Sequence, residues 1–280
     1  MTRPFNPVLV RHLFRLASLK RWNDQIRPLE FSELDKQSHK MILAYLLGKC
    51  EEEAGNPVDW LALIEGGLFD GLVRSLLTDI KPPVYDRMFR DKGNDLHAWI
   101  LTRLAPDFAE APELEQRLRC HLLSTPESTL EKRILKAAHN LATRWEFEII
   151  HRICPFVYGI DETQREIDAQ MEAHASLAGF PRLYPGNRLA HFVDLCGQLR
   201  FQKRWSQSPR LPETSVLGHM FFVAMMTYLA LLRVDACPKR RYNGFFTALF
   251  HDLPEALTRD ITSPVKSSVR GLDDLIKGYE

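Results

Sequence analysis

An internal repeat is the feature that most limits how this chain can fold. LFDGLVRSLLTDIKPPV (residues 68–84) aligns without gaps to LFHDLPEALTRDITSPV (residues 249–265), and eight of the seventeen positions are identical. Self-similarity at a fixed spacing indicates repeated copies of one structural unit. We therefore predict two copies of one domain, at residues 1–180 and 181–280.

Two shorter landmarks recur in the same order, at nearly the same offset. They are KRW, at residues 20–22 and 203–205, and a Glu six residues before a His, as Glu33 with His39 and as Glu213 with His219. The stretch FPRLYPGN lies between the copies and gathers two Pro, a Gly and an Asn. Such a cluster is typical of a domain boundary.

Helical periodicity runs through both copies. Apolar residues recur at intervals of three and four in LVRHLFRLASL, HKMILAYLLGKC, LEKRILKAAHNLATRW and SVLGHMFFVAMMTYLALL. No convincing alternation of apolar and polar residues predicts a pair of strands. The sequence therefore predicts an all-α fold, in which two consecutive helical domains pack together.

Composition excludes several classes of protein. The 37 basic and 36 acidic residues give a net charge of +1, which argues against an extended nucleic-acid surface or a polybasic membrane surface. The longest apolar run, MFFVAMMTYLALL, has 13 residues, fewer than a membrane span needs. No secretory leader is apparent, and the five cysteines form no CxxC pair. We expect a cytoplasmic protein with reduced cysteines and no membrane partner, and a homo-oligomer is compatible with this.

The second copy carries His251 and Asp252 side by side in an apolar helical run. Adjacent residues on a helix diverge by about 100°, so the two side chains can share an ion only if another element completes its shell. His219, early in an apolar helix of the same predicted core, is the natural third ligand. Imidazole and carboxylate together suit Mn, Fe, Co, Ni or Zn better than Ca. The alternative is a locally capped His beside an Asp at a helix end.

These residues resemble those of a known family. HDLPEALTRDITSPVK, from His251 to Lys266, has the form HD-x-x-E-x-L-T-x-D-x-x-x-P-V-K. That pattern resembles the HD-domain superfamily of metal-dependent phosphohydrolases, and most closely its bacterial 5′-deoxynucleotidase branch. The branch also has an Arg-Trp pair before its first metal His, and Arg204-Trp205 stands there in this chain.

The resemblance implies a role for each residue of the second copy. His219, His251 and Asp252 would be ligands of a divalent metal ion (Mn, Co, Fe, Ni, Zn or Mg). Glu255 and Asp260 would be catalytic residues that assist the attacking water and the leaving group. Arg204 and Lys266 would bind the substrate phosphate. Trp205 would wall off the sugar or base, although an ordinary core Trp is an equal alternative.

The chain departs from the family in two places. The nucleotidase branch has a Glu directly before its first His, where this chain has Gly218. The family also completes its metal site with an Asp in a later helix, and the sequence ends before such a helix. We therefore expect the second domain to be incomplete here, either because the sequence is a fragment or because a partner completes the site.

The first copy keeps less of the pattern. His39, Asp70 and His139 stand at its aligned ligand positions, so a degenerate metal site is one expectation. Gly71 and Arg74 replace the Asp of the doublet and the catalytic Glu, which favours a catalytically silent, structural or nucleotide-sensing copy. The function expected for the whole chain is hydrolysis of a nucleoside monophosphate or similar small phosphoester. The alternative is a non-catalytic nucleotide-sensing or scaffold protein.

Overall fold

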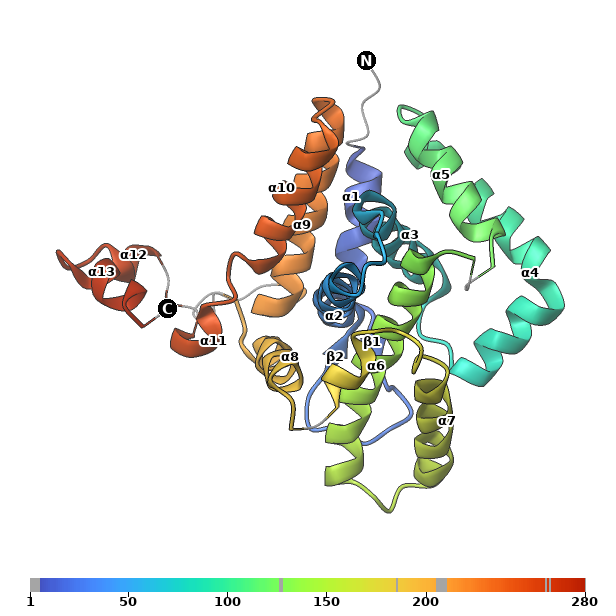
Figure 1. Cartoon of the computed structure of the whole chain (residues 1–280), viewed down its shortest axis with the longest axis horizontal. Helices are drawn as coiled ribbons and strands as arrows, with labels where there is room; N and C mark the ends of the chain where they lie inside the picture. Colours follow the sequence, from blue (N-terminus) through green and yellow to red (C-terminus); the bar gives the residue numbers. More distant parts are fainter. Residues whose placement is uncertain are drawn as a thin grey trace.

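A computed structural model describes residues 6–125, 128–184, 186–204, 211–259, 261 and 263–279. Helices make up most of these residues, which confirms the predicted all-α fold (Figure 1). The α-helices are α1 (Pro7–Arg15), α2 (Glu33–Glu53), α3 (Trp60–Leu77), α4 (Pro82–Leu104), α5 (Pro112–Leu123), α6 (Leu130–Ile153), α7 (Ile160–Glu172), α8 (Arg188–Gln198), α9 (Val216–Arg233), α10 (Pro238–Phe250), α11 (Glu255–Thr258), α12 (Ser263–Lys266) and α13 (Leu272–Lys277). The 3-10 helices are η1 (Ala105–Phe108), η2 (Phe180–Leu183) and η3 (Leu199–Phe201), and the strands are β1 (Lys20–Arg21) and β2 (Phe31–Ser32).

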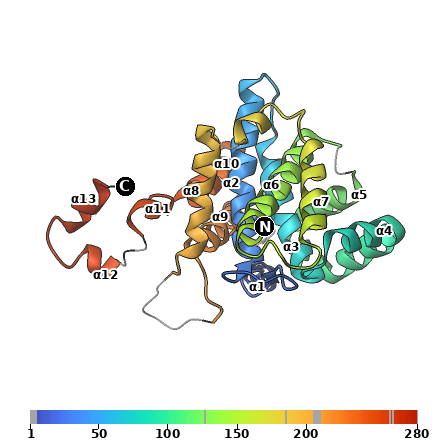
Figure 2. The ribbon, with the colours of Figure 1, turned by 90° about the horizontal axis from the view of Figure 1, so that it is seen from below.

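Helix α2 lies at the centre of the molecule, between α6 on one side and α9 on the other (Figure 1). Residues 33–44 are buried all round the helix, so α2 has no solvent-facing stripe over its first three turns. This explains why polar residues of α2 need partners inside the protein. Helix α8 also packs on α2 (Figure 2).

Helix α9 supplies the most apolar surface of the second half. Its buried residues include Leu217, Met220, Phe221, Met225 and Tyr228, and it packs on both α2 and α10. By length and composition, α9 is the one helix of the described ranges that could cross a membrane, with half of its residues buried inside the protein. A core helix passes the same test.

The starts of α2 and α9 are built in the same way. Lys20 pairs with Ser32 across β1 and β2, and Lys203 forms an antiparallel bridge with Ser215. Each serine then caps its helix by accepting a hydrogen bond from the backbone N–H three residues further on. Both pairs are related by the same offset of 183 residues.

This offset corrects one of the sequence landmarks. Aligning the two Glu and His pairs sets His39 against His219, at an offset of 180. The caps instead set Lys36, four residues after Ser32, against His219, four residues after Ser215. The capping serines, Ser32 and Ser215, mark where α2 and α9 begin and so define which residues of the two helices are equivalent. The spacing between Glu and His does not identify these serines.

The two halves share a hydrophobic core. One continuous cluster of buried residues includes Leu34 and Met41 of α2, Leu68 of α3, Phe221 of α9 and Leu249 of α10. Helices α12 and α13 lie outside this core, beyond α11 (Figures 1 and 2). The domain boundary near residue 180 stays a prediction.

A buried ionic cluster links α6 to β1 in the first half and to η3 in the second half. Glu146 of α6 is completely buried and accepts hydrogen bonds from Arg21 at 2.8 Å and from Arg200 at 2.8 Å. Its carboxylate also accepts a bond from the indole of Trp22, at 2.8 Å. Arg21 and Arg200 are themselves 6% and 5% exposed. Glu146 pairs with both of these guanidinium groups, which water hardly reaches, and Glu33 also accepts from Arg21 at 2.9 Å.

Candidate metal centre

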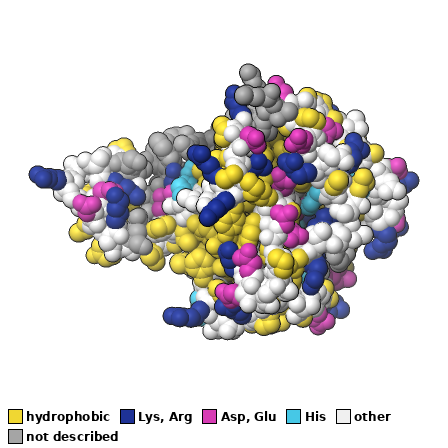
Figure 3. Space-filling model, turned by 45° about the horizontal axis from the view of Figure 1, so that its top comes forward, with side chains coloured by type: hydrophobic (Ala, Val, Ile, Leu, Met, Phe, Trp, Pro, Cys, Tyr) yellow, Lys and Arg dark blue, Asp and Glu magenta, His cyan; other side chains and the backbone are white. Residues whose placement is uncertain are grey.

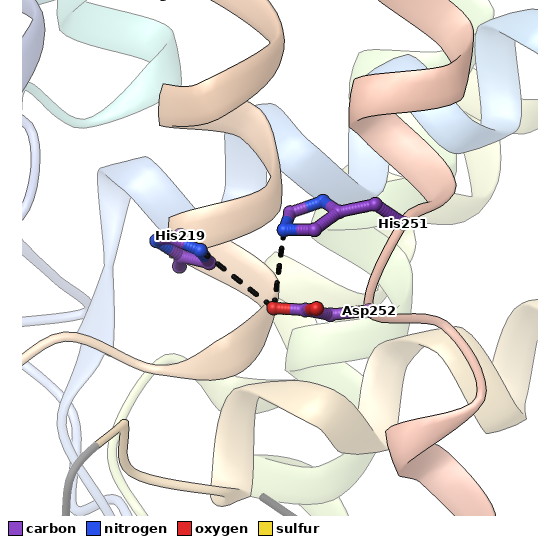
Figure 4. A group of neighbouring side chains, drawn as sticks. All are labelled: His219, His251 and Asp252. Atoms are coloured by element: carbon purple, nitrogen blue, oxygen red, sulfur yellow. Dashed lines mark ion pairs between the residues drawn. The ribbon is translucent and has the colours of Figure 1, made fainter. Parts of the chain in front are cut away.

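His219, His251 and Asp252 lie together where α9 begins and α10 ends (Figure 4). Asp252 Oδ2 is 3.2 Å from His251 Nε2 and 3.6 Å from His219 Nε2. One donor atom from each residue lies within 4.8 Å of the other two, and this is the one such group among the described residues. The helix ends bring together side chains that are 32 positions apart in sequence.

A backbone hydrogen bond fixes the orientation of His251. Its Nδ1 lies 2.7 Å from the carbonyl oxygen of Ala248, so Nδ1 carries the proton and donates it. This leaves Nε2 facing Asp252 and His219 (Figure 4). An imidazole whose second nitrogen donates to a carbonyl is the usual arrangement at protein metal sites.

Asp252 remains a carboxylate in this environment. Burial by itself raises its pKa, but the hydrogen bond from His251 and the charges of His251, Arg204 and His219 outweigh burial and lower it. The hydrogen bond to Asp252 in turn raises the pKa of His251. Two imidazoles and an ionised carboxylate, with side chains 29%, 32% and 16% exposed, fit a first-row divalent cation that remains accessible to solvent.

Arg204 and Glu255 border this group. Arg204 Nη1 donates to Asp252 Oδ2 at 2.9 Å and to Glu255 Oε1 at 3.4 Å. Glu255, at the start of α11, is 7% exposed. Its backbone carbonyl accepts a hydrogen bond from Gln202 at 3.1 Å, which fixes α11 against the segment that precedes Arg204. Arg204 is thus paired with the carboxylates of the site.

An open groove of about 730 Å³ leads away from His251 between α9 and α10. Its lining includes Val223, Thr227 and Leu231 from α9, Gly244 and Thr247 from α10, and His251, which follows α10. A Cβ at Gly244 would lie 2.4 Å from Leu231, so the glycine allows α10 to approach α9 closely. The groove gives the metal group a largely apolar neighbouring surface.

Gly218 has a structural explanation that the sequence did not reveal. A Cβ at this position would lie 2.7 Å from Asp35 Oδ1, so the Glu that the nucleotidase resemblance would place here clashes with that carboxylate. The carboxylate of Asp35 instead accepts hydrogen bonds from Ser32 and from Ser215, the residue that caps α9. Because Asp35 comes from the first half, no pattern within the second half could predict this support.

The structure does not form the predicted site of His39, Asp70 and His139. His39 faces α8, where its Nε2 contacts the Val193 carbonyl at 3.2 Å and its Nδ1 contacts Arg200 at 3.2 Å. Asp70 pairs with Lys40 and with His121, at 3.0 Å for the latter. His139 contacts Lys36 at 2.9 Å. The expectation of a second metal site is therefore wrong, because α2 is in a different register from the one assumed.

Three further predicted residues are not assigned to the group. Trp205 and Asp260 lie outside the described residues, so their roles stay predictions. Lys266 is the last residue of α12, which Figures 1 and 2 place away from the ends of α9 and α10. Its role in phosphate binding also stays a prediction.

Charged side chains of both signs are scattered over the face of the molecule in Figure 3, with hydrophobic side chains gathered near its middle. No single basic patch covers this face. The view agrees with the near-neutral charge of the sequence.

Comparison with known proteins gives one match. No curated protein and no solved structure matches the chain significantly. The family model described as HD domain matches residues 196–279. That segment contains Arg204, His219, His251, Asp252 and Glu255. Over the segment that carries the metal group, the chain is therefore similar to the HD domain family.

Proposed function

We propose that this protein is a divalent-metal-dependent phosphohydrolase that acts on a nucleoside monophosphate or a similar small phosphoester. The observation that carries the proposal is the grouping of His219, His251 and Asp252 within 4.8 Å, in a segment similar to HD domains, which are generally metal-dependent hydrolases. The proposal includes the closer likeness to 5′-deoxynucleotidases, a tandem arrangement with a degenerate first copy, and a cytoplasmic location.

Each side chain of the site has a chemical task in this proposal. His219, His251 and Asp252 would hold the ion, which when bound supplies Lewis-acid stabilisation of phosphoryl oxygens. Glu255 would accept a proton from the attacking water, because it is a carboxylate fixed close to the group. Arg204 would exchange its contacts with Asp252 and Glu255 for two parallel hydrogen bonds to the phosphate.

The groove between α9 and α10 would take the part of the substrate that is not phosphate. It begins at His251, and apolar or small side chains that suit a base or sugar face make up most of its lining, with Lys239 and Arg240 as its basic members. The proposal does not specify which base or which sugar the substrate carries.

The proposal is tested with a panel of nucleoside monophosphates and other small phosphoesters, each with Mn²⁺, Co²⁺ or Mg²⁺. We expect phosphate release that a chelator abolishes. If the protein binds a nucleotide but releases no phosphate with any metal, the non-catalytic sensing or scaffold function replaces this proposal.

Arg204→Lys is expected to raise KM about tenfold or more, because a lysine cannot form two parallel hydrogen bonds to phosphate. The melting temperature should change little, because Lys keeps the positive charge and can still pair with Asp252. Steady-state kinetics and a thermal melt check both statements. Normal KM with a large loss of stability would instead assign Arg204 to the packing of the domain.

Thr247→Trp is expected to obstruct the groove and raise KM for nucleotides, while leaving metal content unchanged. Thr247 is exposed and lines the groove one turn before His251, so the indole needs no space in the core. The matched control is Thr102→Trp on α4, an exposed threonine remote from the site. Equal kinetics for the two variants would place the substrate elsewhere.

A further inference from the structure

The first half carries a second charged cluster at the position that matches the metal centre. The shared caps set Lys36 against His219, and the repeat alignment sets Arg74 against Glu255. Thus an ammonium replaces an imidazole, and a guanidinium replaces a carboxylate. At these two positions the first half has cationic groups, while Asp70 stands where the second half has His251.

Lys36 is buried with few partners. It is 1% exposed, and its Nζ lies 2.9 Å from His139 Nε2, the one hydrogen bond that it makes within the described part of the chain. An ammonium group can donate three hydrogen bonds. Burying it with one partner is costly unless another group shares the charge.

Arg74 reaches the same region from α3. Its guanidinium carbon lies 4.8 Å from the centre of the Tyr85 ring, and among the described residues it forms no ion pair. Its charge acts on both Lys36 and His139. Arg74 and His139 are partly exposed, whereas Lys36 is 1% exposed.

The carboxylates of this region already have other partners. Glu33 accepts from Arg21 at 2.9 Å and from Gln37 at 2.6 Å. Asp70 is held by Lys40 and His121. Asp79 accepts from Asn23 at 3.3 Å, and its pKa is raised, chiefly by burial. Among the described residues, these contacts leave Lys36 and Arg74 without a direct ion pair, and the charges of Glu33 and Glu146 act on Lys36 from a distance and raise its pKa.

The resulting potential at His139 is positive. Burial lowers its pKa, and Lys36, Arg74, Lys40 and Arg21 each lower it further. Burial and then the charge of Arg21 hold the pKa of Lys36 well below its ordinary value. An anion placed between these groups would offset the repulsion that both side chains experience.

We propose that Lys36, Arg74 and His139 form a metal-independent site for a phosphate-bearing ligand. The ammonium, the guanidinium and the imidazole offer hydrogen-bond donors to phosphate oxygens from three helices, α2, α3 and α6. The site lacks the ligand set of the second half and has Arg74 where that half has Glu255. It therefore binds phosphate without hydrolysing it, and it does not depend on the function proposed above.

The test is isothermal titration calorimetry in excess chelator, with inorganic phosphate and with a nucleoside monophosphate as separate probes. The wild-type protein should bind at least the nucleotide, and Arg74→Leu should weaken binding about tenfold or more, the value of one charge-assisted hydrogen bond. Arg87→Leu, which removes an exposed arginine of α4, is the matched control and should bind normally. Binding of the nucleotide alone identifies that ligand, and binding of both identifies the phosphate as the recognised group.

Two further variants separate this site from the metal centre. His251→Ala should keep chelator-resistant binding, whereas Lys36→Met should lose it while retaining its helical circular dichroism spectrum. The proposal is overturned if the wild-type protein binds neither probe, if Arg74→Leu and Lys36→Met bind normally, or if His251→Ala abolishes binding.

Discussion

His251→Ala is expected to remove both the metal binding and the phosphohydrolase activity that we propose. The variant loses an imidazole whose Nε2 is positioned by the Ala248 carbonyl, and it leaves Asp252 with a weaker hold on the ion. Because the ion supplies several kcal/mol of transition-state stabilisation, turnover should fall about a thousandfold. Elemental analysis and phosphate release measure the two losses on one sample.

The matched control for this variant is His191→Ala, which removes an exposed histidine of α8. It should keep the metal content and the turnover of the parent protein. If His251→Ala holds as much metal as the control and turns over as fast, then His251 is a locally capped histidine and the metal centre lies elsewhere.

Glu146→Gln should produce a large loss of stability, about 3–5 kcal/mol, without changing the shape of the side chain. The amide cannot offset the charges of Arg21 and Arg200, both of which remain buried. Chemical denaturation at neutral pH measures the change. Glu148→Gln, which affects an exposed pair with Arg144 on the same helix, is the control and should cost less than about 1 kcal/mol.

The stability that Glu146 provides should also depend on pH. Burial raises the pKa of Glu146, but the charges of Arg21 and Arg200 dominate and lower it to about 2. A lowered folded-state pKa means that the contribution is complete above the ordinary glutamate pKa of 4.5 and is lost as the pH falls toward 2. Glu146→Gln should therefore lose less stability than the parent protein across that range. Parallel acid titrations that lose equal stability would contradict this assignment.

Local sequence patterns predicted the helices and the grouping of His219, His251 and Asp252. Apolar spacing of three and four is a property of a single helix, and the adjacent His251 and Asp252 needed a partner such as His219 in the same core. The sequence could not show that Arg204 pairs with Asp252 and Glu255, since those contacts depend on the turn between α10 and α11.

Contacts between distant segments could not be predicted. Glu146 lies 125 positions from Arg21 and 54 from Arg200, and nothing in the sequence around any of them indicates the cluster. The register of α2 was missed for a related reason. The Glu and His landmark and the KRW landmark align the two halves at different offsets. Only the pairing of Lys20 with Ser32 and the cap at Ser32 decide between these two alignments.

Because α2 packs on α9, the first half has a structural role that does not depend on catalysis or ligand binding. Without residues 1–180, the face of α9 that carries Phe221 and Met225 would meet water and favour association with other chains. A gene that shed the first half would therefore lose the fold of the second. Selection can keep the first half as a partner surface, and residues such as Lys36 and Arg74 are then free to acquire a different use.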